Sequence, residues 1–247
     1  MKRVRTKYRI ASPKVRKSVR LAVASDLHSG DYADVTADFA ACDAVLIPGD
    51  LVDRHRKNNE TAFRFLKEIP GRFPVFYSIG NHEVKFAEQE RWLEAVSRSG
   101  AVLLDNGSRC FEGIRIGGLS SVPDREEPDA AFLDRLEKEK EFLLLMCHQP
   151  EMYRDAVRGR NIDCTVSGHA HGGQIQFFGQ GLYAPGQGLF PKLTHGIYDG
   201  GKLIVSRGMT NSVCLPVPRI HNPCELLILE IRPGDDFSCE RMNGDDE

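Results

Sequence analysis

The amino-acid sequence predicts an α/β protein, and three observations support that expectation. Short apolar segments with the length of buried strands alternate with segments of helical spacing through the first two thirds of the chain. Residues that favour turns, chiefly glycine, proline, asparagine and aspartate, separate these segments. Several apolar segments run directly into an aspartate, asparagine or histidine, as expected where a ligand binds beyond the carboxyl ends of the strands of an open sheet.

The expected elements follow this alternation. Strands are expected at 20–25, 44–48, 74–79, 101–104, 109–119, 142–147 and 164–167. Helices are expected at 34–41, 59–68, 86–98 and 130–140, with a polar loop at 121–130. Asn106-Gly107 has the composition of a hairpin turn and is expected to join the strands on either side of it.

Beyond residue 174 the helical spacing disappears. The segment 174–232 is rich in glycine, and its strands are expected near 174–178, 202–206 and 225–231. No linker divides the chain. A single domain is therefore expected over 19–232, with a basic N-terminal arm at 1–18 and an acidic, flexible tail at 233–247.

Charge is unevenly distributed along the chain. The net charge is −2, but residues 1–20 carry nine lysines and arginines and no acidic residue. One interpretation is a tether to an anionic lipid surface or to nucleic acid. The interpretation that we favour is a solvated leader or an arm folded onto the acidic remainder, because the segment has no series of aromatic residues for stacking bases. Nucleic acid is not an expected partner, and peripheral membrane attachment through the arm stays open.

Cysteine usage and hydropathy indicate a cytoplasmic protein, at the inner membrane face if the arm binds lipid. The seven cysteines are an odd number without a CxxC pair, which does not suggest a disulfide framework. The densest apolar runs, 142–147 and 226–231, are far shorter than the roughly 20 residues of a membrane-spanning helix. The N-terminal positive charge is not followed by the apolar segment of a signal peptide.

Five expected strands end in a residue that can bind a metal ion: Asp26, Asp50, Asn81, His148 and His169. Each of them alone has an ordinary explanation as a turn, cap or core residue. Five at the carboxyl ends of strands indicate a site. A mixture of carboxylate, amide and imidazole groups suits transition metals such as Mn, Fe, Zn or Co, and metal availability decides among these.

Two further histidines extend this set. His28 lies two residues after Asp26, and His171 lies two residues after His169, so the members of each pair can reach one cation. Asp50 has two carboxylate oxygens and can bridge two cations. The other histidines lie in different contexts and are not expected to be ligands: His55, His195 and His221.

These residues resemble the motif blocks of the calcineurin-like metallophosphoesterase superfamily. The resemblance implies a four-layer α/β/β/α sandwich with two mixed β-sheets. It also implies two metal sites that share Asp50, one with Asp26, His28 and His171 and the other with Asn81, His148 and His169. The blocks occur in the order Asp26-Leu-His28, Gly49-Asp50, Gly80-Asn81-His82-Glu83, His148 and Gly168-His169-Ala-His171.

The resemblance also implies roles for residues that do not bind metal. His82 corresponds to the family's histidine that approaches the leaving group. The segment 49–54, Gly-Asp-Leu-Val-Asp-Arg, resembles a block of the protein serine/threonine phosphatase branch, in which the second aspartate pairs with that histidine. Asp53 is therefore expected to orient His82, and Arg54 to contact a phosphoryl oxygen. A surface ion pair is the alternative for both.

A narrower resemblance is to the YkuE/YaeI-type phosphodiesterases, whose relatives include UDP-2,3-diacylglucosamine pyrophosphatases. Segment 168–175, Gly-His-Ala-His-Gly-Gly-Gln-Ile, is similar to a block of that group, and 206–208, 219–220 and 222–225 are similar to its closing segment. Ala170 departs from the usual threonine, which should not affect metal binding. The twin-arginine signal or membrane helix of many relatives is absent here, which leaves localisation open.

The sequence therefore predicts a dinuclear-metal-dependent phosphohydrolase, with a phosphodiesterase or pyrophosphatase preferred. A metal-bridging hydroxide is expected to attack phosphorus while His82 protonates the leaving oxygen. The substrate is a phosphate ester, and a lipid-linked one is compatible with the basic arm. The enzymatic alternative is a soluble phosphomonoesterase or nucleotide phosphodiesterase. The non-enzymatic alternative is a metal-binding interaction scaffold, disfavoured because the ligands and His82 are all present.

Overall fold

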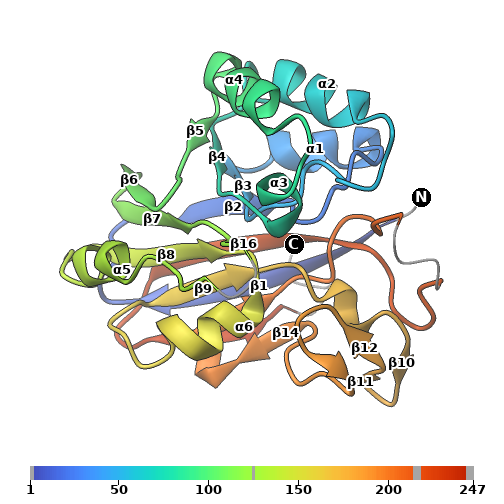
Figure 1. Ribbon diagram of the computed structural model, residues 1–247. Coiled ribbons are helices and arrows are strands. Elements are labelled where there is room, and N and C mark those ends of the chain that lie inside the picture. Colours follow the sequence, from blue (N-terminus) through green and yellow to red (C-terminus); the bar gives the residue numbers. More distant parts are fainter. Residues whose placement is uncertain (1–2, 124–125, 214–217, 243–247) are drawn as a thin grey trace.

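The computed structural model describes residues 3–123, 126–213 and 218–242. Two mixed β-sheets pack face to face, and helices cover the outer face of each sheet (Figure 1). In spatial order the larger sheet contains β17 (Ser238–Arg241), β1 (Val4–Ser12), β16 (Glu225–Pro233), β2 (Val19–Val23), β3 (Ala44–Ile47), β4 (Val75–Tyr77) and β5 (Val102–Leu103). The smaller sheet contains β14 (Gly196–Tyr198), β15 (Leu203–Val205), β9 (Cys164–Ser167), β8 (Phe142–Cys147), β7 (Ile114–Leu119) and β6 (Gly107–Phe111).

The helices form the two outer layers. The larger sheet is covered by η1 (Ala33–Val35), α1 (Thr36–Ala40), α2 (Glu60–Glu68) and α4 (Gln89–Ser99), with the short α3 (Asn81–Val84) at its edge. The smaller sheet is covered by α5 (Ala130–Leu136), α6 (Pro150–Met152) and η2 (Tyr153–Val157). Two further turns are η3 (His171–Gly173) and η4 (Asp199–Gly201). The layers therefore run α/β/β/α, as the sequence predicted.

Three hydrophobic clusters hold these layers together. Side chains of both sheets, including Leu21 and Leu144, fill the space between them. Phe65 and Trp92 of the covering helices pack against the outer face of the larger sheet. Phe132 of α5 packs against the outer face of the smaller sheet. Because strands β3 and β8 are buried on both faces, their sequences read as continuous apolar runs rather than alternating ones.

The expectation of an N-terminal arm separate from the domain is wrong for the residues described. Residues 4–12 form β1, which pairs in parallel with β16 inside the larger sheet. Thr6, Tyr8 and Ile10 are buried, whereas the alternate residues Arg5, Lys7 and Arg9 are partly exposed. This alternation is typical of a strand. It was not recognised in the sequence because the alternate residues carry positive charges.

Several basic residues of this segment are paired with acidic residues elsewhere in the fold. Lys14 lies 2.8 Å from the Asp163 carboxylate, and Lys17 lies 2.7 Å from that of Glu112. The guanidinium of Arg3 is buried and bonded to Asp34 and to the carbonyl oxygen of Met209. Arg5 pairs with Asp38, and Arg9 pairs with Glu230.

Two other expectations also require correction. The tail is not flexible throughout, because 238–241 form β17, which pairs antiparallel with β1; residues 243–247 lie outside the described residues. Asn106-Gly107 is not a hairpin turn between neighbouring strands. Strand β5 belongs to the larger sheet and β6 to the smaller one, and the hairpin is formed by β6 and β7. Its turn is Glu112-Gly113, at which both residues have positive φ.

In the described parts of the chain, no helix is both long and apolar enough to cross a membrane. The six described cysteines are free thiols, and Cys214 lies outside the described residues.

Candidate metal centre

The seven residues expected to bind metal come together where the two sheets meet. Strands β2, β3 and β4 of the larger sheet run parallel and end beside β8 and β9 of the smaller sheet. Two hydrogen bonds connect the strand ends across the sheets. The His169 backbone N–H donates to Asp26 Oδ1 at 3.0 Å, and His148 Nδ1 donates to the Pro48 carbonyl oxygen at 2.9 Å.

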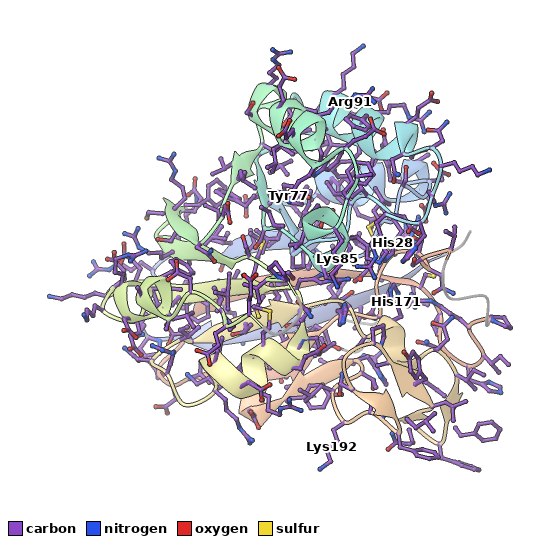
Figure 2. The ribbon with its side chains drawn as sticks, viewed as in Figure 1. His28, Tyr77, Lys85, Arg91, His171 and Lys192 are labelled. Atoms are coloured by element: carbon purple, nitrogen blue, oxygen red, sulfur yellow. The ribbon has the colours of Figure 1, made fainter. Side chains whose placement is uncertain are left out.

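The first group of candidate ligands consists of Asp26, His28 and His171, all of them buried. His171 Nε2 lies 3.8 Å from Asp26 Oδ1, and His28 Nε2 lies 3.9 Å from the same oxygen. His28 Nε2 is also 3.8 Å from Asp50 Oδ2. These separations are long for hydrogen bonds, but they suit atoms that share one cation at about 2.1 Å each. Figure 2 shows His28 and His171 side by side.

The second group consists of Asp50, His148 and His169, which are also buried. His148 Nε2 lies 3.0 Å from Asp50 Oδ2 and 3.1 Å from Asn81 Oδ1. Because His148 Nδ1 carries the proton donated to Pro48, a neutral His148 has its lone pair on Nε2, facing this group. Asp50 therefore lies between both groups, as its expected bridging position requires.

The backbone at this site is unusual. Asp26, His28, Asp50, His169 and His171 all have φ between 45° and 66°, in the left-handed region that residues other than glycine rarely adopt. Such conformations cost free energy and persist only where the surrounding structure fixes them, which occurs mainly at functional sites. Five of the seven candidate ligands share this strain, so the fold holds the site at a cost in stability.

Close packing around the carboxylates explains two of the glycines. A Cβ atom at Gly168 would lie 1.9 Å from Ser25 Oγ and 2.3 Å from Asp26 Oδ2. A Cβ atom at Gly80 would lie 2.2 Å from Asp50 Oδ1. Glycine at both positions lets the backbone of one block approach the ligand of another.

The protonation states fit cation binding. Burial, only partly opposed by nearby carboxylates, lowers the pKa of His28 to about 4 and that of His171 to about 3, so both rings are neutral near pH 7. Both ring nitrogens of His28 are buried and lack a hydrogen-bond partner among the described residues. An orphaned buried imidazole between two carboxylates is costly without a ligand. This environment fits a metal ion at Asp26, His28, Asp50 and His171.

In the second group, His148 and Asp50 shift each other's pKa strongly. Burial alone would lower the pKa of His148, but the adjacent Asp50 carboxylate outweighs burial and raises it to about 9. Burial would raise the pKa of Asp50, but the surrounding histidines hold it well below its usual range. A bound cation would take the place of the His148 proton as the partner of Asp50.

His82 and Asp53 lie next to each other, as expected. His82 Nδ1 is 3.3 Å from Asp53 Oδ1. The buried Asp53 carboxylate also accepts hydrogen bonds from the backbone N–H groups of His55 and Val213, at 3.0 and 2.8 Å. Burial would lower the pKa of His82, but the carboxylates of Asp50 and Asp53 outweigh it and raise the pKa. His82 is close enough to His28 and Asp50 to be a ligand by distance alone.

Arg54 lies beside His82 and His55. Its backbone N–H lies 3.1 Å from His82 Nδ1 and can donate to it when that nitrogen carries no proton. Its guanidinium Nε lies 3.0 Å from His55 Nε2. In the hydrogen bonds of the described residues, this guanidinium contacts none of the seven candidate ligands. A phosphoryl contact from Arg54 stays a prediction.

Of the three histidines not expected to be ligands, only His55 lies near the site. His55 is nearer the site than expected, with its ring centroid 5.6 Å from that of His82. His195 contacts Gln176 and Thr194, and His221 is exposed. Among the described residues, none of these three belongs to a group that could hold a metal ion.

Three residues contact the site in ways that the sequence does not predict. Glu83 belongs to the Gly80–Glu83 block, but the sequence pattern predicts no role for it. Arg219 Nη2 lies 3.1 Å from His171 Nδ1 and donates to the Thr210 carbonyl oxygen at 2.7 Å. Glu151 Oε1 lies 3.3 Å from His169 Nε2. The only sequence signal for Glu151 was its position three residues after His148, beyond the same strand end.

Glu83 holds the loops that carry Asp50 and Asn81. Its buried carboxylate accepts hydrogen bonds from the backbone N–H groups of Asp50 and Gly80, both at 2.9 Å, and of Val52 at 3.2 Å. Three backbone donors from two blocks therefore depend on one side chain.

Replacing Glu83 with alanine is expected to destabilise the protein by about 3–5 kcal/mol, because several buried donors lose their acceptor at about 1–3 kcal/mol each. Urea denaturation of the metal-free protein measures this change, and the exposed Glu90→Ala serves as a matched control. A Glu83→Ala stability within about 0.5 kcal/mol of the wild type would show that these hydrogen bonds do not hold the loops.

Comparisons with known proteins agree with this site. The chain belongs to the calcineurin-like phosphoesterase family, whose model matches residues 19–173. It is 27% identical over 237 residues to an uncharacterized metallophosphoesterase of Campylobacter jejuni, covering 89% of this chain and 61% of that protein. It is 26% identical over 245 residues to one of Aquifex aeolicus, covering 92% and 90%. The metallophosphoesterase YkuE of Bacillus subtilis is 24% identical over 210 residues, covering 75% and 70%.

The family defines a class of metal-dependent phosphoesterases, and the grouped histidines and aspartates are what this chemistry requires. The chain spans less than two thirds of the Campylobacter protein and 90% of the Aquifex protein.

Proposed function

We propose that this protein hydrolyses phosphate esters at a dinuclear metal centre. The observation that carries the proposal is the pair of buried ligand groups that meet at Asp50, within a chain of the calcineurin-like phosphoesterase family. One ion would be held by Asp26, His28, Asp50 and His171. The other would be held by Asp50, Asn81, His148 and His169.

When bound, two such cations lower the pKa of a water molecule between them and neutralise charge on the phosphate. Mixed nitrogen and oxygen ligation suits Mn, Fe or Zn. The protein's own residues supply the remaining chemistry. Asp53 holds the His82 imidazole at the edge of the ligand set, 4.5 Å from the His28 ring between the two centroids. There His82 would donate a proton to the leaving oxygen.

A phosphodiester or a pyrophosphate is the substrate class that we favour. Its support is the similarity of segment 168–175 to the block of the YkuE/YaeI-type phosphodiesterases. The rival is a phosphomonoester. The residues of the site are compatible with both substrate classes, so an assay must distinguish them.

The test compares bis-p-nitrophenyl phosphate with p-nitrophenyl phosphate, using the full chain loaded with manganese. The proposal expects turnover of the diester to exceed that of the monoester. Higher turnover of the monoester would show that the protein is a phosphomonoesterase rather than a phosphodiesterase. Absence of turnover on both, with two ions bound, would indicate an interaction scaffold.

Glu151 is expected to strengthen the second metal position through His169. If His169 Nε2 donates to the Glu151 carboxylate, Nδ1 keeps its lone pair for a cation. The carboxylate is closely enclosed, since a Cβ atom at Gly186 would lie 1.7 Å from Glu151 Oε1. Outer carboxylates of this kind typically contribute about 10- to 100-fold in metal affinity.

Glu151→Ala is therefore expected to weaken one of two metal affinities by about 10- to 100-fold and to leave the other unchanged. Competition with a chromophoric chelator measures both affinities. Glu90→Ala, on the exposed side of α4, is the control. If Glu151→Ala binds both ions as tightly as the wild type, Glu151 does not support His169.

A further inference from the structure

The closing segment 219–222 lies against the turn that carries the candidate ligand His171. That turn, η3, is followed by two small hairpins (Figure 1), formed by β10 (Gln176–Phe177) with β11 (Gln180–Gly181) and by β12 (Tyr183–Ala184) with β13 (Gly188–Leu189). Ile220 forms a parallel bridge with Ile175, just before the first hairpin. The Asn222 side-chain amide donates to the His171 carbonyl oxygen at 2.7 Å. These contacts hold the segment, with Arg219 at its start, beside the metal centre.

The guanidinium of Arg219 makes all of its hydrogen bonds with neutral groups. Its Nε donates to the Asn211 side-chain oxygen, and its Nη2 donates to the Thr210 carbonyl oxygen at 2.7 Å. Nη2 also lies 3.1 Å from His171 Nδ1. The third nitrogen, Nη1, is buried and has no hydrogen-bond partner among the described residues. A buried donor without an acceptor is uncommon, so the two N–H groups of Nη1 are available to a ligand.

The positive charge of Arg219 also lacks a direct partner. Within the described part of the chain no carboxylate forms an ion pair with it, whereas Arg207 pairs with Glu225 at 3.0 Å. Burial lowers the pKa of Arg219, and the attraction of Asp26 and Glu225 only partly opposes this effect. A cation held by Asp26 would add further positive charge beside the guanidinium. An anion that binds next to both would offset the cost of burying this charge.

A hollow of about 770 Å³ opens beside the same side chain. Besides Arg219, its lining includes Asn211, Asn222 and His221, together with two prolines and a cysteine. None of these lining residues is acidic, so none of them repels an anion. The volume lies within the roughly 300–1,000 Å³ that is typical of small-molecule sites. Arg219 therefore both contacts a candidate metal ligand and lines a hollow of the size that holds a small molecule.

We propose that Arg219 binds the phosphoryl group of the substrate, with Nη1 donating to a non-bridging oxygen while an ester group lies in the hollow. The proposal rests on the proposed function, because the phosphate ester is the anion that this function brings to the metal centre. A guanidinium suits the contact because its N–H groups match the geometry of phosphate oxygens. Arg219 belongs to a different segment from Arg54, the arginine that the sequence predicts for such a contact.

The test measures the binding of inorganic phosphate to the full chain loaded with manganese, by isothermal titration calorimetry after excess metal has been removed. Arg219→Gln should bind phosphate about 10- to 100-fold more weakly than the wild type, because it loses charge-assisted hydrogen bonds. Arg219→Lys keeps the charge but not the planar guanidinium and should have an intermediate affinity. Arg98→Gln, the matched control, removes the same charge from the exposed face of α4 and should bind phosphate as the wild type does.

Metal content distinguishes this role from support of His171. Elemental analysis should find two ions in Arg219→Gln and in Arg219→Lys, as in the wild type. Loss of an ion from both variants would make Arg219 a positioning residue for His171 and would overturn the proposal. Circular dichroism checks that the variants are folded, and Arg219→Lys carries the test alone if Arg219→Gln does not fold.

Phosphate binding requires no turnover, so this proposal and the proposed function can fail separately. A wild type that binds phosphate through Arg219 but hydrolyses neither ester would support this proposal and contradict the hydrolase. A folded Arg219→Gln that holds two ions and binds phosphate as tightly as the wild type would overturn this proposal and leave the hydrolase intact. Solvent would then be the partner of Nη1. A wild type that holds two ions and binds no phosphate would overturn the proposal as well.

Discussion

Replacing Asp50 with asparagine is expected to weaken both metal positions at once and to abolish turnover. Asp50 Oδ2 lies 3.8 Å from His28 Nε2 and 3.0 Å from His148 Nε2, so one carboxylate serves both ligand groups. An amide offers one neutral oxygen in place of two anionic ones. The loss of affinity should exceed the roughly 10- to 100-fold that follows loss of an outer hydrogen-bond partner.

Metal content after dialysis, measured by elemental analysis, gives the result directly. Asp155→Asn is a suitable control, since Asp155 is an exposed carboxylate paired with Arg154 on the surface. Thermal unfolding should accompany the analysis, because Asp50 Oδ1 also accepts the backbone N–H of His82 at 2.9 Å. If folded Asp50→Asn retains two ions and full activity, Asp50 does not bridge them.

Replacing His82 with alanine should leave both ions bound but reduce turnover by about 10²–10⁴-fold. The Asp53 carboxylate, 3.3 Å from Nδ1, holds His82 from outside the ligand set. The deficit should be largest for diesters with an alkoxide leaving group, which needs a proton. It should be smaller for bis-p-nitrophenyl phosphate, whose leaving group departs readily as an anion.

His55→Ala is the matched control, because His55 packs 5.6 Å from the His82 ring, between centroids, without belonging to a candidate metal group. Comparison of kcat and KM for the two leaving groups distinguishes proton donation from a structural role. An equal deficit for both leaving groups would argue against proton donation, and loss of a metal ion would make His82 a ligand.

Much of the fold could be predicted, because local sequence and position in the sheet agreed. β3 and β8 are short apolar runs that are followed by a candidate metal ligand, and both lie where expected. β1 was missed because basic residues on its exposed face outweighed the buried Thr6, Tyr8 and Ile10 in the interpretation. The false hairpin at Asn106-Gly107 arose because local turn composition does not reveal that β5 and β6 belong to different sheets.

The candidate site could be predicted in its inner part but not in its surroundings. The candidate ligands follow strand ends, so their positions are set by the sheet topology. Glu83, Glu151 and Arg219 act through contacts between segments distant in sequence, and nothing in the local pattern distinguishes them from surface residues. The exposure of Phe177, Phe178 and Phe190 was likewise not predicted, because an apolar residue in a β-rich segment is ordinarily buried.

The proposed function requires two metal ions that share Asp50. Anomalous X-ray diffraction from crystals of the manganese-loaded full chain shows their positions. We expect two peaks, one among Asp26, His28, Asp50 and His171 and one among Asp50, Asn81, His148 and His169, about 3.5–4 Å apart. A single peak, or two peaks with no shared Asp50 ligand, would contradict it.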